Sequence, residues 1–143
     1  MSDPQAIAEA SARAMYAQDR ASQGLGMRIL EIRPGYARLV MPVREDMVNG
    51  HQLCHGGLIF TLADSAFAFA CNTYDAITVA SSGSVEFLLA ARLGDELTAI
   101  AEERSRAKRT GVYDVAVRNQ RGECVALFRG RSHEIGGAIV TKS

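Results

Sequence analysis

Two glycines stand where a long apolar segment begins, at the end of the stretch Asn49-Gly50-His51-Gln52-Leu53-Cys54-His55-Gly56-Gly57. If that segment is a helix, its first backbone N–H groups have no acceptor within it, and the helix dipole adds partial positive charge there. Such an end can bind an anion or the developing oxyanion of a carbonyl under attack. A simpler interpretation is that Gly56 and Gly57 only permit a tight turn and close packing, and the glycines alone favour it.

Asp64 adds weight to the functional interpretation. It lies about two turns into the same segment, among apolar residues, too deep to cap the helix start. Burying an unpaired carboxylate is costly or raises its pKa. Asp64 could instead face solvent or pair with an arginine such as Arg38 or Arg92. The apolar turns on both sides leave only a narrow water-facing stripe, so we carry a functional carboxylate forward as a hypothesis.

Distance along the helix limits what one copy of the chain can do. Gly56 and Asp64 are eight residues apart, which is about 12 Å along a helix. A base or nucleophile must lie within about 3–3.5 Å of the reacting atom. If both residues serve one reaction, we therefore expect Asp64 of one subunit to meet Gly56 of another across a two-fold axis, giving two equivalent sites.

Other catalytic patterns are weak or missing. His51 and His55 flank Cys54 at a spacing of four, but zinc needs three or four ligands and no further candidate lies nearby, so we predict no metal site. A histidine bonded to backbone at the helix entry is the simpler interpretation. Thr61 and Ser65 carry hydroxyls without a GxSxG nucleophile motif, and GxGxxG, GxxxxGK[ST] and HExxH do not occur.

Length and composition limit the class of protein and the number of domains. The chain has 143 residues and a formal net charge of +0, from 16 Lys+Arg and 16 Asp+Glu. This predicts a single domain with its own core and no overall field that attracts nucleic acid or an anionic membrane. The 3 cysteines form no CxxC pair, residues 1–20 do not resemble a signal peptide, and the apolar stretch 57–71 is shorter than the ~20 residues of a membrane span. We expect a cytoplasmic protein.

The elements that must position these residues follow from periodicity and turn signals. We predict an N-terminal helix over about 4–20 and a long buried helix over Gly57–Cys71, with strands before and after it. The tail from about Gly136 is expected to be loosely held. One buried helix against antiparallel hairpins is an α+β fold whose open edge needs a partner, so we expect oligomerisation. The predicted strands are Met27–Arg33, Tyr36–Val43, Ile77–Ala90, Asp95–Arg106, Val112–Arg118 and Glu123–Ser132.

Basic side chains are concentrated in the second half. Such a run is usually a solvated strand face, and the alternative is a phosphate-rich ligand gripped by arginine. Too few aromatic residues lie among them for a nucleic-acid platform. Between residues 101 and 133, four acidic residues stand against eight basic ones, namely Arg104, Arg106, Lys108, Arg109, Arg118, Arg121, Arg129 and Arg131.

Several motifs, in this order, resemble the phenylacetic acid degradation (PaaI-type) thioesterases of the hotdog superfamily over roughly residues 20–137. They are Asn49-Gly50-His51, Cys54-His55-Gly56-Gly57, Leu62-Ala63-Asp64-Ser65-Ala66-Phe67, Ala70-Cys71-Asn72, Val85-Glu86-Phe87-Leu88, Thr110-Gly111-Val112-Tyr113-Asp114 and Ala126-Leu127-Phe128-Arg129-Gly130. The resemblance implies a hotdog fold, in which a five- to six-stranded antiparallel sheet wraps the long helix.

The resemblance also implies an activity and its residues. It implies hydrolysis of aryl-acyl-CoA thioesters such as phenylacetyl-CoA, by tetramers built from dimers with sites at the dimer interface, without a cofactor other than the CoA of the substrate. Asp64 would be nucleophile or general base, and the Gly56 N–H would polarise the carbonyl. The expected supporting residues are Asn49, His55, Gly57 and Ser65, and the expected CoA contacts are Lys108, Arg109, Thr110, Gly111 and Arg131.

Two departures and two other functions qualify this interpretation. The sequence Leu89-Ala90-Ala91-Arg92 replaces the family's frequent Arg-Pro-Gly-like turn, which we expect to alter a loop near the acyl or CoA channel. Ser65 stands where the family often has threonine, and it keeps the hydroxyl.

A non-catalytic acyl-CoA-binding or sensing protein would not need Asp64. A hotdog hydratase would need a paired Asp and His, and no such pair follows Asp64 at helix spacing.

Overall fold

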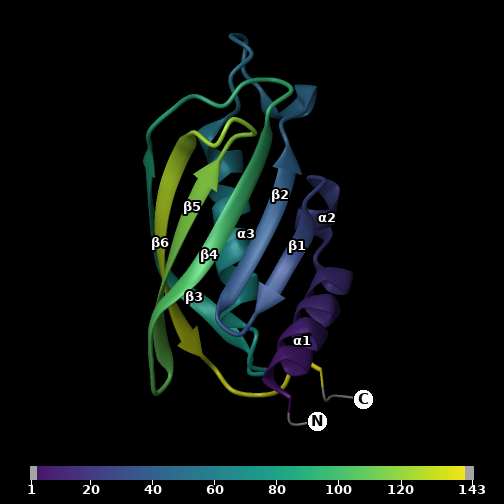
Figure 1. Cartoon of the computed structure of the whole chain (residues 1–143), viewed down its shortest axis with the longest axis vertical. Helices are drawn as coiled ribbons and strands as arrows, with labels where there is room; N and C mark the ends of the chain where they lie inside the picture. The colour runs from purple at the N-terminus through teal and green to yellow at the C-terminus, as the bar shows by residue number, and fades with distance from the viewer. Residues whose placement is uncertain (1–2, 141–143) are drawn as a thin grey trace.

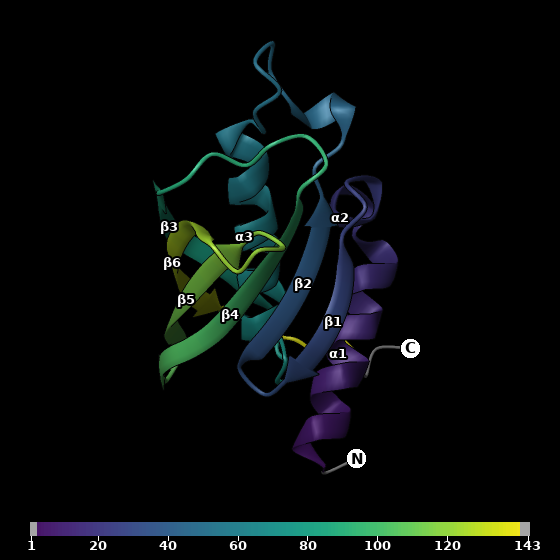
Figure 2. The same cartoon turned by 45° about the horizontal axis from the view of Figure 1, so that its top comes forward.

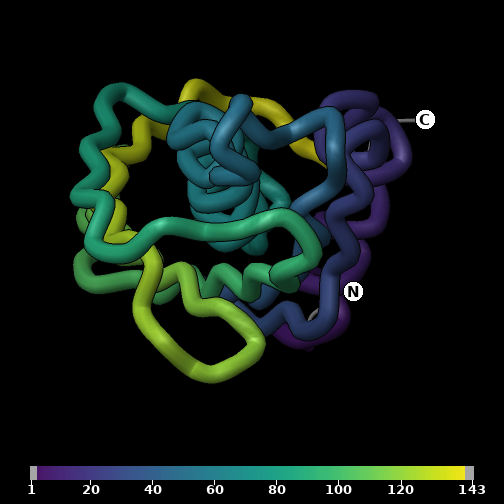
Figure 3. Tube along the Cα trace, turned by 90° about the horizontal axis from the view of Figure 1, so that it is seen from above, coloured from purple at the N-terminus to yellow at the C-terminus, as the bar shows by residue number. Residues whose placement is uncertain are grey.

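A computed structural model describes residues 3–140. Its centre is helix α3 (Gly56–Cys71), and an antiparallel sheet curves around that helix (Figures 1 and 3). The helix is buried through residues such as Leu62, Ala66 and Phe67, which contact the inner face of the sheet. The apolar run forms the predicted helix, and eight of its 16 residues are buried. It begins at Gly56, one residue before the predicted start.

Six strands form one antiparallel sheet in the order β1-β2-β4-β5-β6-β3. The α+β hotdog prediction is confirmed. The strands are β1 (Arg28–Arg33), β2 (Tyr36–Pro42), β3 (Thr78–Phe87), β4 (Glu96–Ala107), β5 (Thr110–Arg118) and β6 (Cys124–Glu134). The predicted strand ends are wrong by up to three residues, since β3 stops at Phe87 rather than Ala90. The β4–β5 hairpin is also tighter than predicted, because Lys108 adopts a φ of 56° in its turn.

The N-terminal segment is two helices, not the single helix predicted over 4–20. Helix α1 (Pro4–Gln18) begins at the N-cap Asp3, whose side chain accepts from the Gln5 N–H. The chain turns at Asp19, which caps the short helix α2 (Arg20–Gly24) by accepting from the Ser22 N–H at 2.9 Å. Helix α1 lies along β1, as Figure 2 shows, and so covers that edge of the sheet.

The described part of the C-terminal tail is held in place, contrary to expectation. The N–H groups of Ile139 and Val140 both donate to the Asp75 carboxylate, at 2.8 and 2.7 Å. The Gly137 carbonyl accepts from the Ile77 N–H at 3.1 Å. Gly136 and Gly137 alone predict a flexible tail. Contacts with a distant segment of the chain instead hold the tail in place as far as residue 140.

Strand β3 forms the opposite edge, and no other element of residues 3–140 covers it. Within that part of the chain it pairs only with β6, and eight of its ten residues are exposed. At its last residue and just after it, the chain exposes Phe87 (52%), Leu88 (55%) and Leu89 (44%). A long, exposed edge strand with apolar residues at its end is a surface that can pair with another chain, although β3 has an irregularity between Ala80 and Ser82.

Candidate active site

The loop before α3 is held by the backbone and by Asn49. The Asn49 side-chain oxygen accepts from the N–H groups of His51 (2.8 Å) and Leu53 (3.2 Å). Cys54 donates its N–H to the Ala91 carbonyl (2.8 Å) and His55 donates its N–H to Met47 (2.9 Å). In this structure the Asn49 oxygen therefore fixes the loop that delivers the helix start. The resemblance predicts that Asn49 orients substrate or water, and no contact here tests that role.

At the helix start two donors are free. Leu58 and Ile59 donate their N–H groups to the His55 carbonyl, whereas the N–H groups of Gly56 and Gly57 have no acceptor among residues 3–140. His55 is the N-cap residue, and its exposed side chain makes no capping bond. The helix thus presents unpaired donors where an oxyanion could sit.

Gly56 is also a site of close approach. A Cβ at this position would lie 2.9 Å from the ring tip of Phe87, whereas a Cβ at Gly57 would meet nothing within 4 Å. Beside Gly56 lies a hollow of about 410 Å³, lined by Cys54, Ile59 and residues 87–91. That lining includes Leu89, Ala90 and Ala91, three of the four residues at which the sequence departs from the family that it resembles.

Asp64 lies at mid-helix, partly exposed, and burial raises the pKa of its carboxyl group. Within the described chain it takes part in no hydrogen bond or ion pair. Arg38, a suggested partner, pairs with Glu31 at 3.5 Å instead. The interpretation of Asp64 as one half of a salt bridge is therefore wrong for a single copy, and the carboxylate is left available.

Ser65 points to another part of the molecule. Its hydroxyl lies 3.0 Å from the hydroxyl of Ser22 in α2, and Ser22 in turn donates to Asp19 at 2.7 Å. Successive helix residues project about 100° apart, so Ser65 is engaged with α2 rather than with the Asp64 side of the helix. Its predicted place in the catalytic group gains no support from these contacts.

The predicted CoA residues do not form one cluster. Lys108, Arg109 and Thr110 line a small pocket at the β4–β5 turn, beside Tyr74 and the C-terminal end of α3. Gly111 is buried against the Ser132 hydroxyl. Arg131 pairs across the sheet with Val112, so it projects from the outer face, away from α3. One copy therefore brings together only the residues at the turn.

Several other arginines are already occupied. Asp114 accepts from Arg129 at 2.6 and 2.8 Å and from Arg104 at 3.0 Å, and these bonds hold the pKa of Asp114 below its usual range. The Arg106 guanidinium lies 3.6 Å from the centre of the Tyr74 ring. Much of the basic run is thus paired within the sheet, as the interpretation of a solvated strand face predicts.

No local sequence signal predicts the aromatic row that joins α3 to strands β5 and β6. Phe60, Phe128, Phe67 and Tyr113 follow one another, with ring centroids 5.3, 5.8 and 5.6 Å apart. Tyr113 then donates its hydroxyl to Glu103 at 2.8 Å. Only Phe60 could have been found from the sequence, because it lies one helical turn before Asp64.

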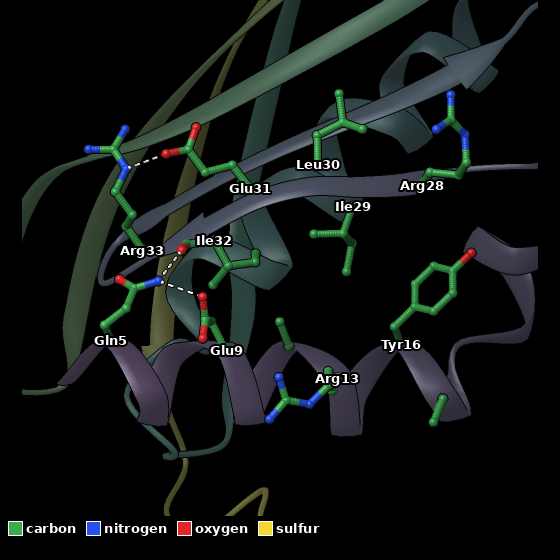
Figure 4. Close-up of a pocket in the computed structure, with 12 residues that line it drawn as sticks. Gln5, Glu9, Arg13, Tyr16, Arg28, Ile29, Leu30, Glu31, Ile32 and Arg33 are labelled. Atoms are coloured by element: carbon green, nitrogen blue, oxygen red, sulfur yellow. Dashed lines mark hydrogen bonds and ion pairs between the residues drawn. The ribbon is translucent and has the colours of Figure 1, made fainter. Parts of the chain in front are cut away.

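A groove of about 1010 Å³ lies elsewhere, between α1 and β1 (Figure 4). Tyr16 of α1 and Ile29 of β1 point toward each other across it, and none of the predicted site residues lines it. Within residues 3–140 no three His, Cys, Asp or Glu side chains are grouped so that they could hold a metal ion. No helix of that part of the chain is long and apolar enough to cross a membrane.

Comparison with known proteins gives a consistent picture. Residues 51–126 match the family model described as the thioesterase superfamily. The acyl-coenzyme A thioesterase PaaI of Escherichia coli K12 is 49% identical over 129 residues, covering 90% of this chain and 92% of that protein. The structure of E. coli PaaI, from the phenylacetic acid degradation operon, has a TM-score of 0.93 at 46% identity and covers 95% of this chain and 99% of that one. A hypothetical thioesterase of Streptococcus pneumoniae TIGR4, solved with coenzyme A, has a TM-score of 0.75 at 27% identity and covers 78% and 90% of the two chains.

Proposed function

The chain belongs to the thioesterase superfamily, as a hotdog-fold relative of the PaaI acyl-CoA thioesterases, and from this premise we propose that it hydrolyses aryl-acyl-CoA thioesters to the free acid and CoA. Phenylacetyl-CoA and its ring-hydroxylated forms are the expected substrates, and phenylacetate degradation is the expected setting. The observation that carries the proposal is an available carboxylate, Asp64, on the same helix as two unpaired N–H donors.

The chemistry needs only these groups and water. The thioester carbonyl oxygen accepts from the Gly56 N–H, which stabilises the negative charge that develops during attack. In one route Asp64 takes a proton from water as the water oxygen bonds to the carbonyl carbon. In the other route the Asp64 carboxylate attacks and water later hydrolyses the anhydride. In both, the C–S bond breaks and the CoA thiolate leaves, then takes up a proton.

A dimer would complete the site. Gly56 and Asp64 are eight residues apart in one continuous helix, or about 12 Å, so a single copy holds them too far apart to act on one carbonyl. Pairing of two β3 edges would continue the sheet and place two α3 helices side by side in opposite directions, because antiparallel pairing follows a two-fold axis. Asp64 of each copy would then approach Gly56 of the other. We expect two such dimers to form a homotetramer.

Lys108 and Arg109 are the proposed contacts for the CoA phosphates, because neither forms an ion pair within the described chain and both line the pocket at the β4–β5 turn. Three free cysteines, Cys54, Cys71 and Cys124, fit the reducing cytoplasm, where we expect the protein to act. The CoA contact is tested by Lys108→Ala with Arg109→Ala, which should raise KM for the CoA thioester but not for a thioester lacking the nucleotide.

The activity is tested with a panel of CoA thioesters bearing aryl and straight-chain acyl groups, scored by release of free thiol. We expect Asp64→Asn to lower kcat at least about 100-fold, the range of a lost general base. Asp46→Asn serves as the control, since Asp46 is exposed and bonded to Arg44. Full activity of Asp64→Asn on every thioester that the wild type cleaves would contradict the assignment, and binding without hydrolysis by the wild type would favour the sensing function.

A further inference from the structure

Phe60 occupies a position that the proposed chemistry leaves unexplained. It lies one helical turn after Gly56 and one turn before Asp64, so all three project from neighbouring positions on α3. Residues four apart on a helix have Cβ atoms about 5–6 Å apart. A group that contacts Phe60 therefore lies within about one helical turn of a group held beside Asp64.

The ring of Phe60 bridges helix and sheet. Its tip lies 3.6 Å from the position that a Cβ on Gly83 of β3 would occupy. It meets Phe128 in an edge arrangement, with centroids 5.3 Å apart and planes at 74°. Phe128 is 3% exposed, whereas Phe60 is only partly buried. Phe60 is thus the open end of the aromatic row, facing the uncovered edge of the sheet.

Two glycines shape the floor of this region. Gly83 and Gly130 are paired across β3 and β6. A Cβ at Gly83 would lie 3.1 Å from the Phe128 ring, and a Cβ at Gly130 would lie 2.8 Å from Phe67. The Phe128 and Phe67 rings pack against the sheet at positions that lack a side chain, and this contact holds the aromatic row in place. Gly83 is itself exposed, so flat backbone adjoins the open end at Phe60.

We infer that Phe60 and the Gly83 backbone form the acyl subsite, and that Phe60 selects a flat aromatic acyl group over a linear one. The inference rests on the proposed thioester hydrolysis and names the residue that sets its substrate class. An aromatic ring gains from edge or offset contact with another ring beyond the area that it buries, whereas an alkyl chain gains only from the area. A ring laid on Gly83 against Phe60 obtains both contributions.

The test compares kcat/KM for phenylacetyl-CoA with that for hexanoyl-CoA in the wild type and in Phe60→Leu, which keeps an apolar side chain and removes the ring. We expect the phenylacetyl-to-hexanoyl ratio to fall about 3- to 10-fold, the range of one aromatic contact. Phe69→Leu is the matched control, because Phe69 lies on the same helix and packs against Tyr16 of α1 at 6.3 Å. Its ratio should stay at the wild-type value.

A second variant approaches the subsite from the sheet. Gly83→Ala directs a methyl group at the Phe128 ring, 3.1 Å away, and so displaces the aromatic row beside Phe60. It should also lower the ratio, with Ser84→Ala on the same strand as its control. An unchanged ratio in both Phe60→Leu and Gly83→Ala, or loss of the oligomer in Phe60→Leu by sedimentation, would overturn the inference, since Phe60 would then serve packing between copies. If the wild type cleaves neither thioester, the proposed function itself fails, which is a separate result.

Discussion

Asp64 combines partial burial with the lack of a basic partner among residues 3–140, and burial raises the pKa of its carboxyl group. Both proposed routes need the ionised form, so activity should appear only as pH rises through that pKa. We expect the acid limb of the kcat/KM profile to lie above the ordinary aspartate value of about 3.9. Steady-state rates from pH 4 to 9 on phenylacetyl-CoA measure it. A limb at or below the ordinary value would contradict the role of Asp64.

The same raised pKa predicts a cost in stability. Below the unfolded-state pKa, Asp64 is protonated in both states and costs nothing. As pH rises from the unfolded-state pKa to the higher folded-state pKa, the unfolded state loses its proton first, and the free energy of unfolding falls to a lower plateau. Asp64→Asn should therefore melt about 1–3 °C higher than the wild type at pH 7, and the difference should shrink toward pH 4. Melting curves at the two pH values decide this, and a less stable Asp64→Asn at pH 7 would refute it.

Prediction from sequence works for single residues when the signal is local. Asp64 within an apolar helix and Gly56 at its start are both visible in a short window, and the structure leaves both groups free of partners within one copy. Ser65 could not be understood in this way, because its hydroxyl contact is Ser22, 43 positions away. Which carboxylate or hydroxyl is already engaged depends on tertiary contacts that no local pattern records.

Packing between α3 and the sheet depends on positions that have no side chain. Gly130 of β6 faces the ring of Phe67, which is 1% exposed, and a Cβ there would lie 2.8 Å from the ring. Because the buried ring has little room to shift, Gly130→Ala should lower the free energy of unfolding by about 2 kcal/mol, typical of overpacking. Denaturant titrations at matched protein concentration measure it.

Gly24→Ala provides the control for this change. A Cβ at Gly24 would meet nothing within 4 Å, and replacing a helical glycine by alanine reduces the entropy of the unfolded chain. We expect it to be neutral or slightly stabilising. If Gly130→Ala proved as stable as Gly24→Ala, the close approach of α3 to β6 would not be as tight as the contacts indicate.

At the scale of elements, the order of strands and helices was predictable because hydrophobic periodicity and glycine turns are local. Helix α3 and the alternation in β2, with Ala37, Leu39 and Met41 buried, follow directly from the sequence pattern. The break between α1 and α2 at Asp19 was not predicted. The Asp19 side chain can cap α2 only after the chain has turned, and the sequence pattern does not show that turn. The anchored tail was missed for a similar reason, since Asp75 belongs to a different part of the chain.

For the whole molecule, positive and negative charges balance in total. Many of them also neutralise each other locally, in ion pairs within the sheet. Arg104 and Arg129 share Asp114, while Arg121 bonds to Glu123 at 3.0 Å. The basic second half of the chain therefore presents fewer free cations than the count of arginines indicates. We therefore propose that the residues at the β4–β5 turn recognise the CoA phosphates, through a small, specific contact rather than a broad basic field.

The uncovered β3 edge and the separation of Gly56 from Asp64 lead to one prediction about assembly. Asp64→Asn removes the carboxylate, and Gly56→Pro removes the N–H at a position where proline is tolerated. Each variant alone should be nearly inactive. After equal mixing and random exchange, half of the dimers contain one copy of each variant, and each of these has one intact site if sites are shared. Activity should then recover to about 25% of the wild-type value.

A site contained within one subunit predicts a different result, because no mixture would then hold an intact site. Subunit exchange is followed by native mass spectrometry, and Asp64→Asn mixed with itself controls for activation by handling. The ring of Phe87, 52% exposed beside Gly56, can turn outward to admit the proline, so the Gly56→Pro chain should still assemble. Proven exchange without recovered activity would show that Asp64 and Gly56 of different copies do not act together, and the dimer would then have to be sought through another surface.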